Sequence, residues 1–149
     1  MITTQLTTDT IETMLTHLCK KFEGTLTKDL NDYVLAIDNE IGYGTVRGIA
    51  LKGGISYLEF DMEFNQDVAL AIKTLDNSPI YFTYCSEGSI SHTFASEGKK
   101  RKLESFQTAI TTCKDGEESH LNFGKNKQIR VSLITVQRSA HHVVSDEFS

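Results

Sequence analysis

The most regular pattern in the chain is an alternation of apolar and acidic residues between positions 55 and 64 (ISYLEFDMEF). From position 58 onward the even positions are apolar, and the odd positions between them carry Glu59, Asp61 and Glu63. A period of two is typical of a β-strand with one face on a core and the other in water. We therefore predict a central strand over 55–64 whose even positions are buried.

A second alternating stretch spans residues 79–94 (PIYFTYCSEGSISHTF). The alternation stops at Glu87, Gly88 and Ser89 and resumes at Ile90. A glycine-centred break between two alternating runs is a hairpin signal. The stretch is therefore interpreted as two strands that pair with each other.

Shorter alternating runs, separated by turn residues, predict further strands. They are expected at 33–38, 45–51, 68–73, 109–113, 120–123 and 129–136, with a loop or an irregular edge strand at 25–32. In the last run, Val131 and Leu133 share one face, and Ile134 and Val136 share the other. The glycines at 42 and 44 suit a turn or a bulge, because glycine tolerates positive φ.

One helix is predicted over residues 9–24. Asp9 with Glu12 forms a potential capping box, and Gly24 is a plausible stop. The helix should present one apolar face, either to its own core or to another subunit. That face consists of Ile11, Met14, Leu15, Leu18 and Phe22. One helix followed by some nine or ten short strands predicts an all-β antiparallel sandwich, jelly roll or barrel.

The composition fits one globular domain, and a net charge of −5 over 149 residues argues against direct nucleic-acid contact by the chain. The basic cluster at 99–102 is better explained as a solvated edge strand. No apolar run is long enough to span a membrane, and no secretion signal is visible. Cys19, Cys85 and Cys113 lack a CxxC spacing and are expected to be free thiols in a reducing cytoplasm.

No nucleotide-binding loop or nucleophile elbow occurs in the sequence. His92 and His120 could approach each other across a barrel and contribute to a metal site, which would need three or four ligands. The carboxylates at 59, 61 and 63 resemble an acid–base array, but a polar outer face accounts for them better. We therefore assign no catalytic residue, metal ligand or cofactor.

Residues 33–94 resemble the N-terminal regulatory domain of AraC/XylS-family transcriptional regulators, in particular its cupin-like form. The resemblance lies in Ala36-Ile37-Asp38-Asn39, Gly42-x-Gly44, Gly54-Ile55-Ser56, Phe60-Asp61-x-x-Phe64 with Asp67, and Pro79-Ile80-x-Phe82 leading to Glu87-Gly88. It implies a double-stranded β-helix, a cupin-like jelly roll, whose interior can take a small effector. In the family this domain often dimerises and precedes two helix-turn-helix units that read DNA.

The resemblance implies a single cupin-like domain over 1–149, with the jelly roll at 33–136 and a tail at 137–149 leading to a DNA-binding domain that the chain does not contain. The metal-binding motif of the wider cupin fold is degenerate here. His92 stands alone where a His-x-His pair would be, and the turn at Asp115-Gly116 before His120 lacks a proline.

The sequence thus predicts a cytoplasmic, non-enzymatic domain that binds a small-molecule effector and forms a homodimer through the helix or a sheet edge. The expected ligand-binding residues are Tyr57, Tyr81, Tyr84 and His92 at the mouth of the jelly roll. Which of them face inward depends on strand register, since a slip of one residue reverses the faces. The alternative is a small stand-alone cupin that binds a sugar-like ligand or carries out metal-dependent chemistry with His92 and His120.

Overall fold

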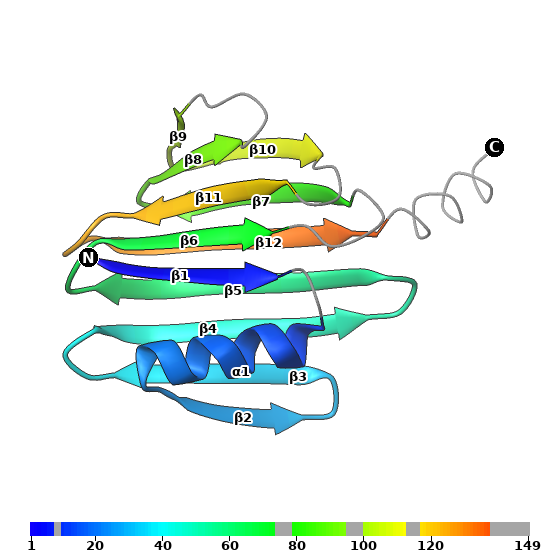
Figure 1. Cartoon of the computed structure of the whole chain (residues 1–149), viewed down its shortest axis with the longest axis horizontal. Helices are drawn as coiled ribbons and strands as arrows, with labels where there is room; N and C mark the ends of the chain where they lie inside the picture. Colours follow the sequence, from blue (N-terminus) through cyan, green and yellow to red (C-terminus); the bar gives the residue numbers. More distant parts are fainter. Residues whose placement is uncertain (8–9, 74–78, 95–99, 113–116, 138–149) are drawn as a thin grey trace.

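A computed structural model of the chain describes residues 1–7, 10–73, 79–94, 100–112 and 117–137. Figure 1 labels the strands and the helix within these ranges in chain order. Their bounds are β1 Ile2–Thr7, α1 Ile11–Phe22, β2 Thr25–Asp29, β3 Asp32–Asp38, β4 Gly42–Leu51, β5 Ile55–Phe64, β6 Val68–Lys73, β7 Ile80–Glu87, β8 Ile90–Phe94, β9 Lys100–Leu103, β10 Gln107–Thr112, β11 Glu118–Phe123 and β12 Gln128–Val136.

The strands form two sheets that face each other. The large sheet has seven strands in the order β10-β7-β12-β5-β4-β3-β2, and the small sheet has five in the order β1-β6-β11-β8-β9. The β1–β6 pair is parallel and the other pairs are antiparallel. Figure 1 shows the small sheet in front of the upper part of the large one.

The pairing is nested in the way that defines a jelly roll. β5 pairs with β12, β6 with β11, β7 with β10, and β8 with β9, and every one of these pairs is antiparallel. Successive pairs alternate between the large and the small sheet. The chain from β5 to β12 is therefore one long hairpin rolled around a common core, which is the double-stranded β-helix predicted from the sequence.

Alternating side chains of both sheets and one face of α1 share this core. Phe22 of α1 lies 5.4 Å from Phe64 of β5 between ring centroids, and Phe64 lies 5.7 Å from Phe123 of β11. These rings join the helix, the large sheet and the small sheet. Burying such a side chain contributes about 1.5–3 kcal/mol.

Helix α1 covers the part of the large sheet formed by β2, β3 and β4, beyond the reach of the small sheet (Figure 1). The predicted apolar face, Ile11, Met14, Leu15, Leu18 and Phe22, is buried. Of the two predicted partners for this apolar face, its own core and another subunit, the face packs on its own core. The predicted cap is wrong, because Thr10 accepts the backbone N–H of Thr13 at 3.1 Å. Asp9 lies outside the described residues.

The predicted hairpin at 79–94 is also wrong. The left-handed backbone of Gly88 (φ +78°) does break the alternation, as expected. However, β7 belongs to the large sheet and β8 to the small one, and the two strands do not pair. The break at Gly88 is a crossing between sheets, which local alternation cannot distinguish from a hairpin.

Most other predicted strands are confirmed with shifts of a few residues at their ends. β2 is an edge strand, and β9 (Lys100–Leu103) places the basic cluster at the edge of the small sheet, as expected for a solvated edge. Strand β1 was not predicted, because ITTQLT has too few apolar residues to show a pattern. Among the described residues, no helix has the length and apolar character needed to cross a bilayer.

Candidate functional site

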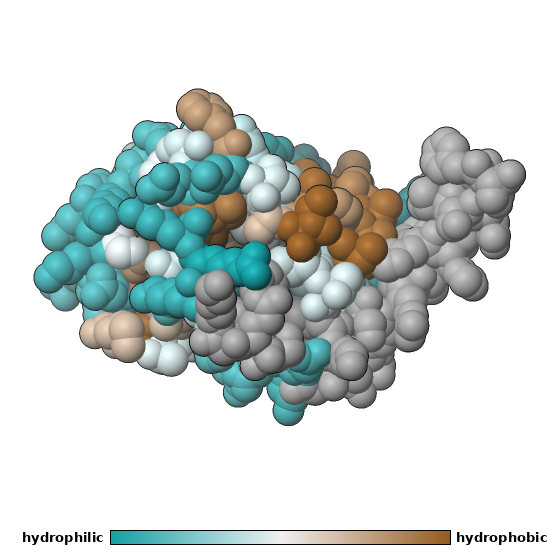
Figure 2. Space-filling model, turned by 90° about the horizontal axis from the view of Figure 1, so that it is seen from above, coloured by the Kyte–Doolittle hydropathy of each residue, from teal (hydrophilic) through white to brown (hydrophobic). Residues whose placement is uncertain are grey.

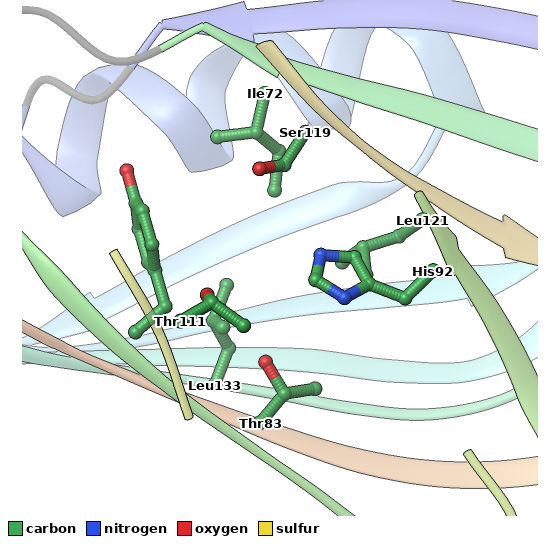
Figure 3. Close-up of a pocket in the computed structure, with 8 residues that line it drawn as sticks. Ile72, Thr83, His92, Thr111, Ser119, Leu121 and Leu133 are labelled. Carbon is green, nitrogen blue, oxygen red and sulfur yellow. The ribbon is translucent and has the colours of Figure 1, made fainter. Parts of the chain in front are cut away.

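A small cavity lies between the two sheets and is lined by side chains from both. Its polar lining consists of Tyr81 and Thr83 of β7, His92 of β8, Thr111 of β10 and Ser119 of β11, with Ile72, Leu121 and Leu133 as apolar walls. Figure 3 shows the side chains of Thr83, His92, Thr111 and Ser119 directed toward a common space. The solvent-sized space in the cavity is about 10 Å³, enough for one water molecule.

The polar cavity arises because β7 and β10 turn their more polar face inward. In β7, Tyr81 and Thr83 are 5% and 2% exposed, whereas Tyr84 on the opposite face is 38% exposed. In β10, Thr111 is 6% exposed and Ile110 is 66% exposed. This is the reverse of the usual arrangement, in which the apolar face of a half-buried strand covers the core.

His92 is the one ionisable imidazole in the cavity lining, and it is 5% exposed. Burial is the main cause that lowers its pKa below the ordinary value, because the buried site disfavours the charged ring. The positive charge of Arg101, its cross-strand neighbour on β9, lowers the pKa further. His92 is therefore a neutral hydrogen-bonding group at pH 7, and it can both donate and accept.

Among the described residues that line the cavity there is no carboxylate, lysine or arginine. Tyr81, Thr83, Thr111 and Ser119 offer hydroxyl groups, each of which donates one hydrogen bond and accepts others. Together with the neutral imidazole they form an uncharged polar surface inside an apolar core. Such a lining suits an uncharged ligand with hydroxyl, carbonyl or amide groups, because burying an unpaired charge would be costly.

A second hollow adjoins the first toward α1 and the C-terminal end of β12. It is lined by Ile11, Met14, Ser56, Leu58, Ile72, Tyr81, Leu133, Thr135 and Gln137, with about 20 Å³ of solvent-sized space. Ile72, Tyr81 and Leu133 line both hollows and so form the partition between them.

The structure places the four predicted ligand-binding residues on two different faces. Tyr81 and His92 line the cavity. Tyr57 and Tyr84 lie on the outer face of the large sheet and do not. The Tyr57 hydroxyl donates a hydrogen bond to the Glu59 carboxylate and lies 3.1 Å from the Ser132 hydroxyl, also on the outer face. Partial burial and the bond to Glu59 raise the pKa of Tyr57.

The register of the small sheet separates His92 from His120. His92 lies opposite Leu121, and both side chains face inward. His120, which directly precedes Leu121 on β11, lies opposite Thr93 and faces outward. His120 instead lies 3.9 Å from a carboxylate oxygen of the partly buried Glu118. A metal centre that combines the two histidines is therefore inconsistent with this fold. Within the described part of the chain, no three His, Cys, Asp or Glu side chains gather as metal ligands.

The acidic residues of β5 lie on the outer face of the large sheet, as expected from their alternation. Asp61 accepts hydrogen bonds from Arg130 at 3.0 Å and from the Gln128 amide at 2.7 Å. Glu59 accepts from Tyr57. These contacts are those of a polar outer face, as the alternation in this strand predicts.

Thr83, Thr111 and Ser119 line the cavity but were not singled out from the sequence. One signal was available for Thr83, because it stands two positions from Tyr81 and must share its face. Thr111 and Ser119 had none, because threonine and serine are common on solvent-facing strands and only the register reveals their burial.

No protein-family model matches the chain, and the search of curated proteins gives no match. Solved structures of cupin domains resemble it in fold. One is the cupin domain of an XRE-family transcriptional regulator from Enterobacter cloacae, with 10% identity, a TM-score of 0.43, and coverage of 56% of this chain and 81% of that one.

Another is a cupin protein from Bacteroides fragilis, with 13% identity, a TM-score of 0.46, and coverage of 60% of this chain and 70% of that one. An ectoine synthase from P. lautus has 16% identity and a TM-score of 0.45 over 75% of this chain and 76% of its own. Because these scores lie below 0.5, the fold is assigned from strand order and nested pairing. On that basis the chain is an all-β jelly roll of the cupin type with one N-terminal helix.

Proposed function

We propose that the chain is the effector-sensing domain of a cytoplasmic transcription regulator of the AraC/XylS type, and that it binds a small uncharged effector between its two sheets. The observation that carries the proposal is the convergence of five buried polar side chains on one cavity within the core. They come from both sheets and are Tyr81, Thr83, His92, Thr111 and Ser119.

Five buried polar groups are costly for a purely structural core. Each must keep a hydrogen-bond partner, since an unsatisfied buried group costs about 1–3 kcal/mol. Val or Leu at the same positions would fill the space with no such requirement. A set of polar groups around an apolar-walled space is typical of small-molecule sites, where a few polar groups orient the ligand.

The effector would enter by displacing the partition between the two hollows. The present space holds about one water molecule, so a ligand of several atoms requires Tyr81 to move. A movable side chain at the centre of the fold would also couple binding to the position of β7 and of β12 next to it. β12 leads directly into residues 137–149, where the resemblance expects the connection to a DNA-binding domain.

Matched neutral and charged probes test the ligand class. We would titrate the chain with phenol and benzoate, and with D-glucose and D-glucuronate, and follow backbone amide resonances by NMR. The neutral probes should shift resonances of β7, β8 and β11 near the cavity, and the charged probes should not. Equal binding of benzoate and phenol, or the lack of any response at the cavity, would contradict the proposal.

Two substitutions on β10 provide a matched pair for the same titration. Thr111→Val removes a hydroxyl from the cavity, while Thr108→Val removes one from the outer face of the same strand. The first should weaken binding by up to about tenfold, the equivalent of one hydrogen bond, and the second should not change it. An unchanged affinity in Thr111→Val would place the ligand elsewhere.

The regulatory part of the proposal is tested by the size of the native protein. An immunoblot of cell extract with an antibody to this domain should reveal a polypeptide near twice the 16.7 kDa of the chain. Such a band would have room for a DNA-binding half. A band of 16.7 kDa would leave ligand binding in place but would contradict the regulator proposal.

A further inference from the structure

The inverted orientation of β7 and β10 places apolar side chains on the outer face of the large sheet. Ile110 of β10 is 66% exposed, although it alternates with the buried Thr111. On β7, Phe82 lies directly opposite Ile110 and shares its outward face. Strands that are inverted in this way turn apolar side chains away from the core.

The register shows that these residues belong to two apolar rows that run across the sheet. We call both rows together the outer apolar band. The first row is Ile110, Phe82, Ile134, Tyr57 and Ile49, and the second row is Ile80, Val136, Ile55 and Leu51. Ile134 and Leu51 are 37% and 53% exposed. Figure 2 views the molecule from the side of β9 and β10. It shows apolar residues, in brown, gathered to the right of the centre.

Beyond these rows the same face is polar. Arg47 and Asp32 form a pair at 2.7 Å, and Arg130 and Asp61 form another at 3.0 Å. The outer apolar band is therefore confined to one end of the sheet and ends at the edge strand β10. Contiguous apolar side chains on an outer sheet face are a feature of interaction sites in folded proteins.

The four edge strands differ in how they are protected against pairing. β9 carries three basic residues, and β2 carries Lys28 and Asp29. Strand β1 lies beside α1, and its Thr4 hydroxyl is 3.0 Å from the His17 imidazole of that helix. Charged side chains and covering elements are the usual protection of a sheet edge.

Within the part of the chain that the structure describes, β10 lacks this protection. Its sequence, QTAITT, contains no charge, proline or glycine and is rich in β-branched residues. Among the described residues it pairs with β7 on one side and with no strand on the other. An uncharged strand of high β-propensity with a free edge is a template for another strand.

We propose that β10 pairs antiparallel with β10 of a second copy of this chain, around a two-fold axis at Ile110. An antiparallel pair of identical strands is isologous, so one contact closes the dimer. Opposite residues in a sheet share a face, and this register sets Ile110 against the partner's Ile110 and Thr108 against the partner's Thr112. It is the register that brings the two exposed isoleucines together.

The pairing would join the outer apolar bands of the two copies into one continuous surface. Of the two interfaces predicted for the homodimer, the helix and a sheet edge, this proposal selects the edge strand β10. It excludes α1 as the interface, because the apolar face of α1 is buried in its own core. The proposal does not rest on effector binding, because the paired edge and the outer face are separate from the cavity between the sheets.

Sedimentation of the chain from about 1 to 100 μM, a range that resolves micromolar dissociation constants, tests the interface. The unmodified chain should form dimers, and Ile110→Lys should be monomeric, since a charge at the edge opposes pairing. Leu51→Lys, at the far end of the same band, should remain dimeric. A monomeric unmodified chain overturns the proposal. Dissociation by Leu51→Lys as well would indicate stacking through the band and would overturn the edge contact.

A disulfide trap tests the register independently of affinity. In a chain with Cys19→Ser and Cys113→Ser, an added Ile110→Cys should form a covalent dimer under mild oxidation. Directly opposite residues of an antiparallel pair lie about 4.5–5.5 Å apart between Cα atoms, within disulfide range. Thr108→Cys in the same background should not cross-link, because it faces the partner's Thr112. Cross-linking by Thr108→Cys in place of Ile110→Cys would overturn the register.

Discussion

Gly48 of β4 lies directly beneath Leu15 of α1, and the absence of a side chain at Gly48 allows the helix to pack on the sheet. A Cβ atom at position 48 would stand 2.6 Å from Leu15 Cδ1 and 2.6 Å from Ile11 Cγ2. Both distances are well below van der Waals contact. Leu15 is completely buried, so it has little room to move aside.

Gly48→Val should therefore destabilise the protein by about 2 kcal/mol, since overpacking of a close-packed core costs about 1–3 kcal/mol. Urea unfolding followed by circular dichroism would measure the loss. Ala50→Val, at an exposed position of the same strand, is the matched control and should be neutral or slightly stabilising. Equal stability of Gly48→Val and the unmodified chain would mean that α1 does not pack on β4 as described.

The sequence could predict which residues form strands better than it could predict which strands pair. The alternation in β5 and β12 identified the buried residues of both strands, such as Phe60 and Val131. In β7 both faces contain aromatic residues, so alternation could not decide whether Tyr81 or Tyr84 faces inward. The answer comes from β7 lying between β10 and β12, a contact between segments far apart in the chain.

The same limit explains the errors in the candidate site. The sequence groups Tyr57 and Tyr84 with Tyr81 and His92 at the mouth of the jelly roll, because alternation does not fix the register that decides which of them face inward. Tyr57 lies on the odd-numbered face of β5, which is apolar at Ile55 and acidic at Glu59. Only the strand register shows that this whole face lies outside the core. A threonine such as Thr111 becomes part of a site through tertiary burial, which has no local signature.

The cap of α1 provides a second stability prediction. The Thr10 hydroxyl accepts the Thr13 N–H, which would otherwise lack a partner at the helix N-terminus. Thr10→Ala should cost about 1 kcal/mol of unfolding free energy in urea titrations. Thr16→Ala, at an exposed interior position of the helix, should be neutral or stabilising because alanine is the better helix former. A loss of similar size in both variants would argue against a specific cap.

Cys85 and Cys19 should differ sharply in reactivity. Cys85 is fully buried, its thiol lies 3.3 Å from the Gly88 carbonyl oxygen, and burial raises its pKa. The thiolate is the reactive form, so both its pKa and its burial protect Cys85. In a Cys113→Ser background, a thiol reagent should label the partly exposed Cys19 in the native protein and label Cys85 only on unfolding. Rapid native labelling of both thiols would contradict this burial.

His92 predicts the pH dependence of stability. Burial and Arg101 lower the pKa of the folded-state imidazole below the ordinary value of 6.5. Between the two pKa values the unfolded chain binds a proton that the folded chain does not, so the free energy of unfolding falls as the pH falls. The full contribution is present above about pH 6.5, and the slope is at most about 1.4 kcal/mol per pH unit below it.

Urea unfolding of the unmodified chain, His92→Gln and His120→Gln between about pH 7.5 and pH 5 isolates this effect, because carboxylates titrate mainly below that window. The free energy of unfolding of His92→Gln should be lower at pH 7.5 but should change less as the medium is acidified. His120→Gln, which replaces a half-exposed histidine outside the cavity, is the matched control for a histidine-to-glutamine substitution. An unchanged slope in His92→Gln would mean that His92 accepts its proton as readily in the folded as in the unfolded chain. A buried, neutral imidazole between the sheets would then be ruled out.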